Sequence, residues 1–197
     1  MIEDPLPMQR AQIDLSAADA VVSDVELALG DPGYPDLAFM LSYWQEKRGS
    51  RLAPSREEID PADFVQILPR VMLADVLATP LNFRYRLSGT GICNVHGEDL
   101  THLLASELQP PQYGALIHGH YAQAVTEKRP LLHLIRFESV DKLRTYARLL
   151  LPLSADGVTI NMLMSVDSAN QNSRALQSFF DSARNAKASA DEPAMLR

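Results

Sequence analysis

The chain has 197 residues, and its 18 basic and 25 acidic side chains give a formal net charge of −7 at pH 7. Its apolar fraction of 46% is typical of a globular protein, and its length supports one core with at most a second small unit. Residues 1–36 carry eight acidic side chains against Arg10 alone. This distribution argues against sequence-independent nucleic-acid binding, which needs a net positive surface.

The sequence also indicates the compartment of the protein. It has no stretch of about eighteen apolar residues, and its first residues lack the basic and apolar pattern of a signal peptide. Its single cysteine, Cys93, excludes a disulfide within the chain and a zinc site made of cysteines alone. We therefore expect a cytoplasmic protein without a membrane span.

Residues 1–35 are predicted to be an acidic N-terminal extension with an amphipathic helix at 16–29. Ser16 and Asp19 have the spacing of a capping box, and apolar residues follow them at helical intervals. The apolar stripe of this helix would either dock on the domain or pair with another chain. A partly frayed tail is the alternative.

A main domain is predicted over residues 36–168, and it contains three helical regions. A helix is predicted at 36–48, where apolar residues share one face and Gly49 ends the run. Start signals at 55–68 indicate one or two short helical turns. A long helix is expected at 110–128, opened by two prolines.

Extended runs separate these helices and indicate a sheet. Runs rich in β-branched and aromatic residues, often in strict alternation, are typical of strands. The predicted strands are 71–78, 83–87, 131–139, 143–153 and 158–167. Two strands, a helical middle and three further strands predict an α+β fold, in which a five-stranded antiparallel sheet carries helices on one face.

Residues 169–197 are expected to form a C-terminal helix followed by a tail. Leu176, Phe179 and Phe180 would lie on one stripe of a helix at about 171–187. The last ten residues have the composition of a disordered segment.

Four local motifs occur in order along the predicted domain. They are Arg51-Leu52-Ala53-Pro54-Ser55-Arg56, Ile59-Asp60-Pro61, Phe83-Arg84-Tyr85-Arg86-Leu87-Ser88-Gly89-Thr90 and Gly97-Glu98-Asp99-Leu100-Thr101. With the order of strands and helices, they resemble the PAS domain, in particular a PAS-like family of stand-alone alphaproteobacterial regulatory proteins. The resemblance covers about residues 36–167. It departs from the family pattern at His102, where a glycine is frequent.

The resemblance implies a sensory or protein-interaction module rather than an enzyme. Any small-molecule pocket would lie between the sheet and the helical middle, and the helices before the core would form a dimer or partner surface. With no output domain after residue 167, the signal would leave through contact with another protein. We expect a protein partner in a signalling pathway, a homodimer, a possible small-molecule ligand and no nucleic acid.

Alternate residues of the predicted strands share a face that would point at the helices. This set either lines a ligand pocket or fills a packed core, since protein interiors are normally filled. The pocket candidates are Phe83, Tyr85, Leu87, Ile135, Phe137, Leu149, Ile160, Met162 and Met164.

The opposite strand faces carry basic side chains that would form a stripe on the sheet. The candidates for a partner surface are Trp44, on the helix at 36–48, and Arg84, Arg86, Arg144 and Arg148. In one hypothesis the acidic segment 1–36 covers this stripe and a partner displaces it. A solvated face balanced by nearby acids is the alternative.

Catalytic motifs are incomplete. Gly89-Thr90-Gly91-Ile92-Cys93-Asn94 lacks the third glycine of a dinucleotide fingerprint, and Ser88 lacks the first glycine of a nucleophile elbow. Cys93 and His96 would share a helix face, which permits a thiolate–imidazole pair, although a small buried thiol beside a surface histidine is the commoner arrangement. We therefore predict no catalytic residues.

His118 and His120 lie two apart on the long helix, so they point to nearly opposite sides and do not chelate one ion. No metal site is predicted, and His102 and His133 are interpreted as surface or turn histidines. No cofactor is the first expectation. The alternative is a haem- or metal-dependent redox or gas sensor, because haem needs only one protein ligand, here His118 or His120, and an apolar pocket.

Overall fold

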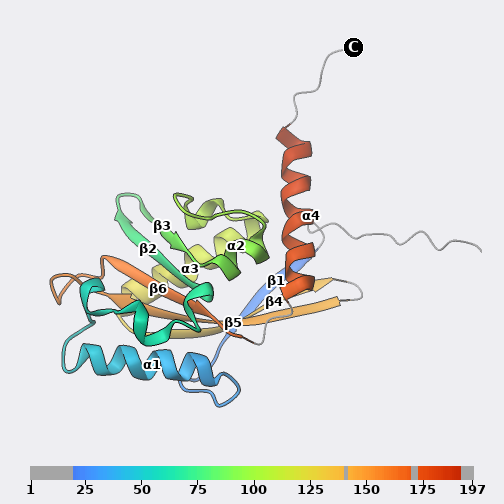
Figure 1. Ribbon diagram of the computed structural model, residues 1–197. Coiled ribbons are helices and arrows are strands. Elements are labelled where there is room, and N and C mark those ends of the chain that lie inside the picture. Colours follow the sequence, from blue (N-terminus) through green and yellow to red (C-terminus); the bar gives the residue numbers. More distant parts are fainter. Residues whose placement is uncertain (1–19, 140–141, 170–172, 192–197) are drawn as a thin grey trace, which may run out of the picture.

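In the computed structural model, which describes residues 20–139, 142–169 and 173–191, one antiparallel sheet lies between helices (Figure 1). The strand order is β1-β4-β5-β6-β2-β3. The strands are β1 Val21–Glu26, β2 Val71–Ala78, β3 Leu81–Ser88, β4 Leu131–Ser139, β5 Lys142–Leu153 and β6 Met162–Asp167. The helices are α1 Pro35–Arg48, α2 Thr90–His96, α3 Pro111–Glu127 and α4 Ser173–Asp191. No helix among the described residues is long and apolar enough to cross a membrane.

The α+β class is confirmed, with one more strand than the five predicted. The helix predicted at 36–48, the β2–β3 hairpin, the long helix and the strands β4 and β5 lie where the sequence places them. The region 55–68 forms short 3₁₀ turns at Arg56–Glu58 and Pro61–Phe64, with a third at Leu68–Arg70. These segments have the strongest periodicity or the clearest start signals in the sequence.

The extra strand, β1, lies within the predicted helix at 16–29, and that prediction is wrong over its described part. Residues 21–26 pair antiparallel with β4, from Val21 opposite Glu138 to Glu26 opposite His133. Three of the six residues are valines, whose branched side chains favour the extended conformation. The free edge of β4 supplies backbone partners that a helix would not use. Residues 1–19 lie outside the described part of the chain.

Two other boundaries differ from the prediction. Strand β6 begins at Met162 rather than at residue 158, because the Asp156 carboxylate accepts hydrogen bonds from the backbone N–H groups of Val158 and Thr159 and holds them in a turn. Helix α4 continues to Asp191, so residues 188–191 of the expected disordered tail are helical. The rest of that tail lies outside the described residues.

The sheet has an inner face toward α2, α3 and α4 and an outer face toward α1 (Figure 1). On the inner face Tyr113 of α3 contacts Tyr146 of β5, and Phe180 of α4 contacts Phe137 of β4. On the outer side α1 packs along β5, where Trp44 donates from Nε1 to the Pro152 carbonyl at 2.7 Å. Trp44 is only 1% exposed, so it belongs to the core rather than to the expected partner surface.

His102 occupies a position that favours glycine. Its φ of 76° is in the left-handed region, which non-glycine residues adopt uncommonly. Its backbone N–H donates to the Tyr85 carbonyl, and the Tyr85 N–H donates to the Leu103 carbonyl. The turn therefore pairs with the edge of β3 that has no neighbouring strand. A histidine here takes the conformation that the resemblance assigns to glycine.

Candidate functional site

A buried ion pair lies on the inner face of the sheet. Arg148 of β5 is 1% exposed and pairs with Asp167, its register partner at the end of β6. The pair is bidentate, with Nε to Oδ1 at 2.6 Å and Nη2 to Oδ2 at 3.0 Å. Strands β5 and β6 are thereby joined at the point where the chain leaves the sheet toward α4.

Tyrosines extend this polar cluster across the inner face. The hydroxyls of Tyr113 and Tyr146 lie 2.7 Å apart, and the Arg148 guanidinium carbon lies 5.2 Å from the centre of the Tyr146 ring. The Tyr121 hydroxyl lies 3.3 Å from that of Tyr85 and hydrogen-bonds Ser165 on β6. Burial raises the pKa of the Tyr146 hydroxyl well above its usual value, so it remains protonated.

The pocket candidates do not line one cavity. Four of them lie buried on the inner face and contribute to the packed core: Phe83, Tyr85, Ile135 and Phe137. Three others lie on the outer face toward α1: Leu149, Met162 and Met164. Their predicted orientation toward the inner face is wrong. Ile135 of β4 lies opposite Tyr146 of β5, so Tyr146 shares the inner face with Ile135. The odd-numbered residues of β5, which include Leu149, therefore point to the outer face.

The two remaining pocket candidates lie at the margins. Ile160 is buried just before β6 begins. Leu87 is 42% exposed, because a bulge between Leu73 and Ala74 shifts the register and sends its side chain to the outer face.

The predicted basic stripe is not formed. Arg144 and Arg148 point inward, and the Arg144 guanidinium carbon lies 5.8 Å from the centre of the Phe179 ring. Arg84 and Arg86 are exposed on β3 at the far side of the sheet, where Arg86 pairs with Asp75. The arginines therefore lie on different faces, and they do not offer one surface to an acidic segment.

Among the pockets of the described chain, two lie away from the pocket candidates. The larger, of about 310 Å³, is lined by Pro69, Arg70, Gly91, Asn94, Val95, Ser168, Ala169 and Gln177. The smaller, of about 20 Å³, lies where His96 and Phe180 meet the turn around Leu108. None of the nine pocket candidates lines either pocket.

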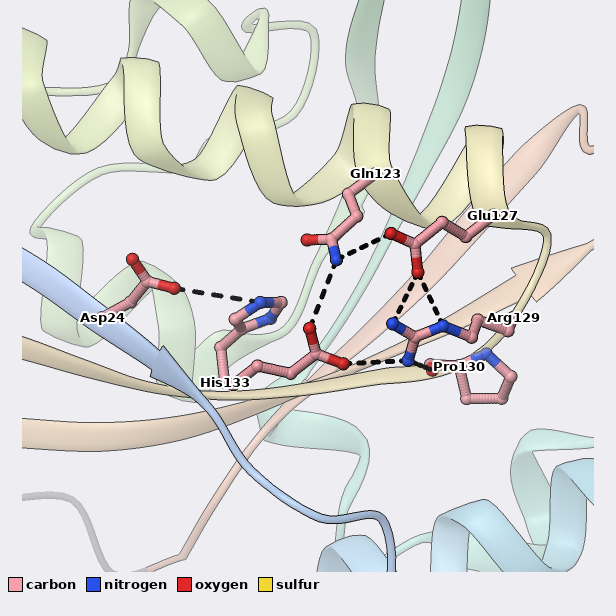
Figure 2. Close-up of polar contacts among 7 residues, drawn as sticks. Asp24, Gln123, Glu127, Arg129, Pro130 and His133 are labelled. Carbon is pink, nitrogen blue, oxygen red and sulfur yellow. Dashed lines mark hydrogen bonds and ion pairs between the residues drawn. The ribbon is translucent and has the colours of Figure 1, made fainter.

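A second polar cluster joins β1, α3 and β4. The imidazole of His120 lies 2.9 Å from the Asp24 carboxylate, from Nε2 to Oδ2, and its ring stacks on that of His133 at 3.8 Å. His133 Nε2 is 3.8 Å from the same oxygen (Figure 2). His133 is 2% exposed, so its interpretation as a surface or turn histidine is wrong. The sequence did not show this cluster because Asp24 was assigned to a helix.

Both histidines of this cluster are held neutral. Burial, with a smaller contribution from His133, lowers the pKa of His120 to about 4 despite the neighbouring Asp24. Burial also lowers the pKa of His133. Their Nδ1 atoms are buried and have no hydrogen-bond partner among the described residues.

A network of charged side chains borders the cluster on its solvent side (Figure 2). Arg129 forms ion pairs with Glu26 of β1 and Glu127 of α3, and Gln123 donates to both carboxylates. The acids of β1 thus contact α3 and the start of β4 rather than a basic stripe. This arrangement ties the edge strand to the helix that covers the inner face.

The other predicted chemistry-bearing residues are not brought together. His118 contacts the Leu81 carbonyl through Nε2 at 3.0 Å and is partly exposed. The Cys93 thiol lies near the Ser88 carbonyl and the Asp99 carboxylate, whereas the His96 ring stacks on Phe180 at 4.0 Å. A haem bound to His118 or His120 would have to displace the partner that its Nε2 contacts.

Burial of His96 predicts a loss of stability in mild acid. Burial lowers the pKa of His96 to about 3, whereas in the unfolded chain it titrates near 6.5. The unfolded state therefore takes up a proton first as the pH falls below 6.5, and the free energy of unfolding decreases. We expect His96 to contribute about 1 kcal/mol of this decrease between pH 7 and 5.5.

Urea unfolding at both pH values tests this contribution. The His96→Phe variant keeps the aromatic contact with Phe180 and should lose less stability on acidification than the unmodified chain. Equal pH dependence of the two proteins would show that His96 does not stay neutral in the fold.

Comparison with known proteins places these elements in a family. Residues 35–166 match the family model described as PAS domain. The match runs from α1 to the end of β6 and leaves out β1 and α4. No curated protein matches the chain.

Proposed function

The chain belongs to the PAS domain family, and from this premise we propose that it is a regulatory module whose output is contact with another protein. Membership of the family supports a sensory or regulatory role in general. The contact with a protein partner, the absence of enzymatic activity and the homodimer argued below are the specific parts of the proposal.

The packed interior favours protein contact over binding of a large ligand in the core. The space between the sheet and α3 is filled by the tyrosines and by the Arg148–Asp167 pair. Phe179 and Phe180 of α4 close the inner face at the other end. A close-packed interior transmits changes made at the surface, because it deforms little.

An exposed apolar pair on the outer face is the observation that carries the proposal. Val21 and Leu143 are 63% and 62% exposed. Both lie directly opposite Glu138 of β4 in the strand pairing, Val21 on β1 and Leu143 on β5. They lie near the first residues of β1 and β5. Exposed apolar residues bordered by charges are typical of interaction surfaces.

A second copy of the chain fits this surface. Glu138 and Arg136 are both exposed on the same face of β4, two residues apart. A two-fold axis between them would set Glu138 of each protomer opposite Arg136 of the other, and the two apolar pairs would lie on either side of this axis. We therefore propose a homodimer formed through the outer face of β1, β4 and β5.

A substitution at Leu143 tests this dimer. We expect Leu143→Asp to weaken self-association at least tenfold, because a carboxylate would be buried beside Glu138 of the same row. Light scattering with size-exclusion chromatography over a dilution series measures the change. Val158→Asp is the matched control, because Val158 is 66% exposed in the β5–β6 turn.

The control variant should associate as the unmodified chain does. Equal weakening by both variants, or none by Leu143→Asp, would reject this dimer surface. A chain that is monomeric at every concentration would reject the homodimer and leave contact with a different protein as the proposed output.

A small-molecule ligand is the second candidate function, and the larger pocket favours it. Arg70, Asn94, Ser168 and Gln177 place polar groups in a lining that is otherwise apolar, a combination typical of small-molecule sites. The pocket lies beside α2 and the end of β6, away from the candidates expected from the strands. Retention of a metabolite by the purified chain, lost on Asn94→Leu substitution, would support this candidate.

A further inference from the structure

We propose that Asp24, His120 and His133 form a binding site for one divalent transition-metal ion of the zinc class. The three side chains come from β1, α3 and β4, and their ligand atoms all lie within 4.8 Å of one another. This site is independent of the protein contact proposed above, because it lies on the inner side of β1 and not on the outer face.

The distances are close to those of a metal centre. Ligand atoms on a tetrahedral zinc ion lie about 3.4 Å apart, as bond lengths of about 2.0–2.2 Å require. Here Asp24 Oδ2 is 2.9 Å from His120 Nε2 and 3.8 Å from His133 Nε2. The rings are stacked with 7° between their planes, so each ring would have to rotate before both nitrogens point to one ion.

The side chains lack the partners that buried polar groups normally have. The two imidazoles and the carboxylate share one hydrogen bond, between His120 and Asp24. The Nδ1 atoms of both histidines are without partners among the described residues, and His133 Nε2 is beyond hydrogen-bond length from Asp24. An ion bound through the two Nε2 atoms and the carboxylate would give all three side chains a common partner, whereas the two Nδ1 atoms would still lack one among the described residues.

The protonation state of the histidines suits a metal. A metal ion binds the unprotonated imidazole, and binding must otherwise displace a proton. Burial lowers the pKa of both His120 and His133, so both are neutral at physiological pH. Asp24 supplies the negative charge and is 30% exposed, which leaves a path for the ion and a place for water as a further ligand.

The surrounding charge also favours a cation. The acids that act on His133 are Asp24, Glu26 and Glu127, and the base beside them is Arg129. These four groups carry a net charge of −2 when ionised. Two imidazoles and one carboxylate select zinc, cobalt, nickel or copper over magnesium and calcium, which prefer oxygen ligands.

Titration of the untagged full chain with ZnCl₂, after treatment with EDTA, tests the site. We expect one zinc ion per chain by calorimetry, and Co²⁺ in its place should give the visible absorption of a four-coordinate ion. His133→Ala and Asp24→Asn should each weaken binding about 100-fold or more. His118→Ala is the matched control, because His118 lies on the same helix outside the cluster, and it should leave the affinity unchanged.

The outcomes separate a metal site from a structural cluster. Circular dichroism without metal shows whether each variant is folded, and Asp24→Asn decides the result if His133→Ala is unfolded, because Asp24 is partly exposed. Failure of the unmodified chain to bind zinc or cobalt would overturn the proposal. Binding that persists in Asp24→Asn, or that is lost in His118→Ala, would also overturn it.

Discussion

Replacing Arg148 with methionine is expected to lower the free energy of unfolding by about 3–5 kcal/mol. The substitution leaves Asp167 as a carboxylate that is 3% exposed and has lost its bidentate partner. Removal of one member of a buried pair is costly because the remaining charge has neither water nor a counter-ion. Urea unfolding, monitored by circular dichroism, measures the loss.

Two controls separate the buried pair from a general effect of losing an arginine. The double substitution Arg148→Met with Asp167→Leu should recover most of the stability, because no unpaired charge remains. Arg86→Met removes an arginine whose pair with Asp75 is largely exposed, so it should change the stability by less than about 1 kcal/mol. A loss of less than 1 kcal/mol in Arg148→Met would contradict the structural role of the pair.

Truncation of Phe180 to alanine is expected to cost about 3–5 kcal/mol. Phe180 is 2% exposed, stacks on His96 at 4.0 Å and contacts Tyr113 and Phe137. In Figure 1 the first turns of α4 lie near α2 at the end of the sheet, and the rest of the helix projects away from it. The truncation therefore tests whether α4, which lies outside the family match, belongs to the folded core.

Thermal and urea unfolding of Phe180→Ala should be compared with Ser178→Ala. Ser178 is exposed two residues earlier on the same helix, so its substitution should change stability by less than about 0.5 kcal/mol. Equal stability of the two variants would show that α4 does not pack on the domain in solution. A large loss in Phe180→Ala alone would support α4 as the link between the inner face and any partner.

The fold was predictable where the sequence has a strong local period. The helix ending at Arg48, the β2–β3 hairpin and the long helix α3 each show one clear pattern with start or stop residues. Strand β1 was not predictable in this way, because a segment of six residues can fit both the helical and the strand periodicity. Its structure depends on pairing with the edge of β4, which is more than 100 positions away in the sequence. Tertiary pairing decides the structure of such short segments.

The orientation of β5 was harder to predict than its existence. Residues 149–151 are three consecutive leucines, so both faces of the strand are apolar and alternation gives no sign of the inner face. Arg148 was therefore placed on the surface. Its burial depends on Asp167, whose position beside it is set by the register of β6.

Of the three residues of the histidine cluster, only His120 was identified from the sequence as a candidate ligand. His118 and His120 are close in the sequence, but their side chains contact different groups, Leu81 and Asp24, as expected for residues two apart on a helix. The ligand partners of His120 come instead from β1 and β4. The alternation of Asp24 and Glu26 would have placed both acids on one strand face had residues 21–26 been assigned as a strand.

Native mass spectrometry of the freshly purified, untagged chain is the most direct test of a regulatory module that acts through protein contact. We expect a species of twice the chain mass with no organic ligand retained in its packed core, and dissociation of this species in Leu143→Asp. A monomer that carries a haem or a metabolite would contradict the proposal, because it would place the function of the chain in ligand binding instead.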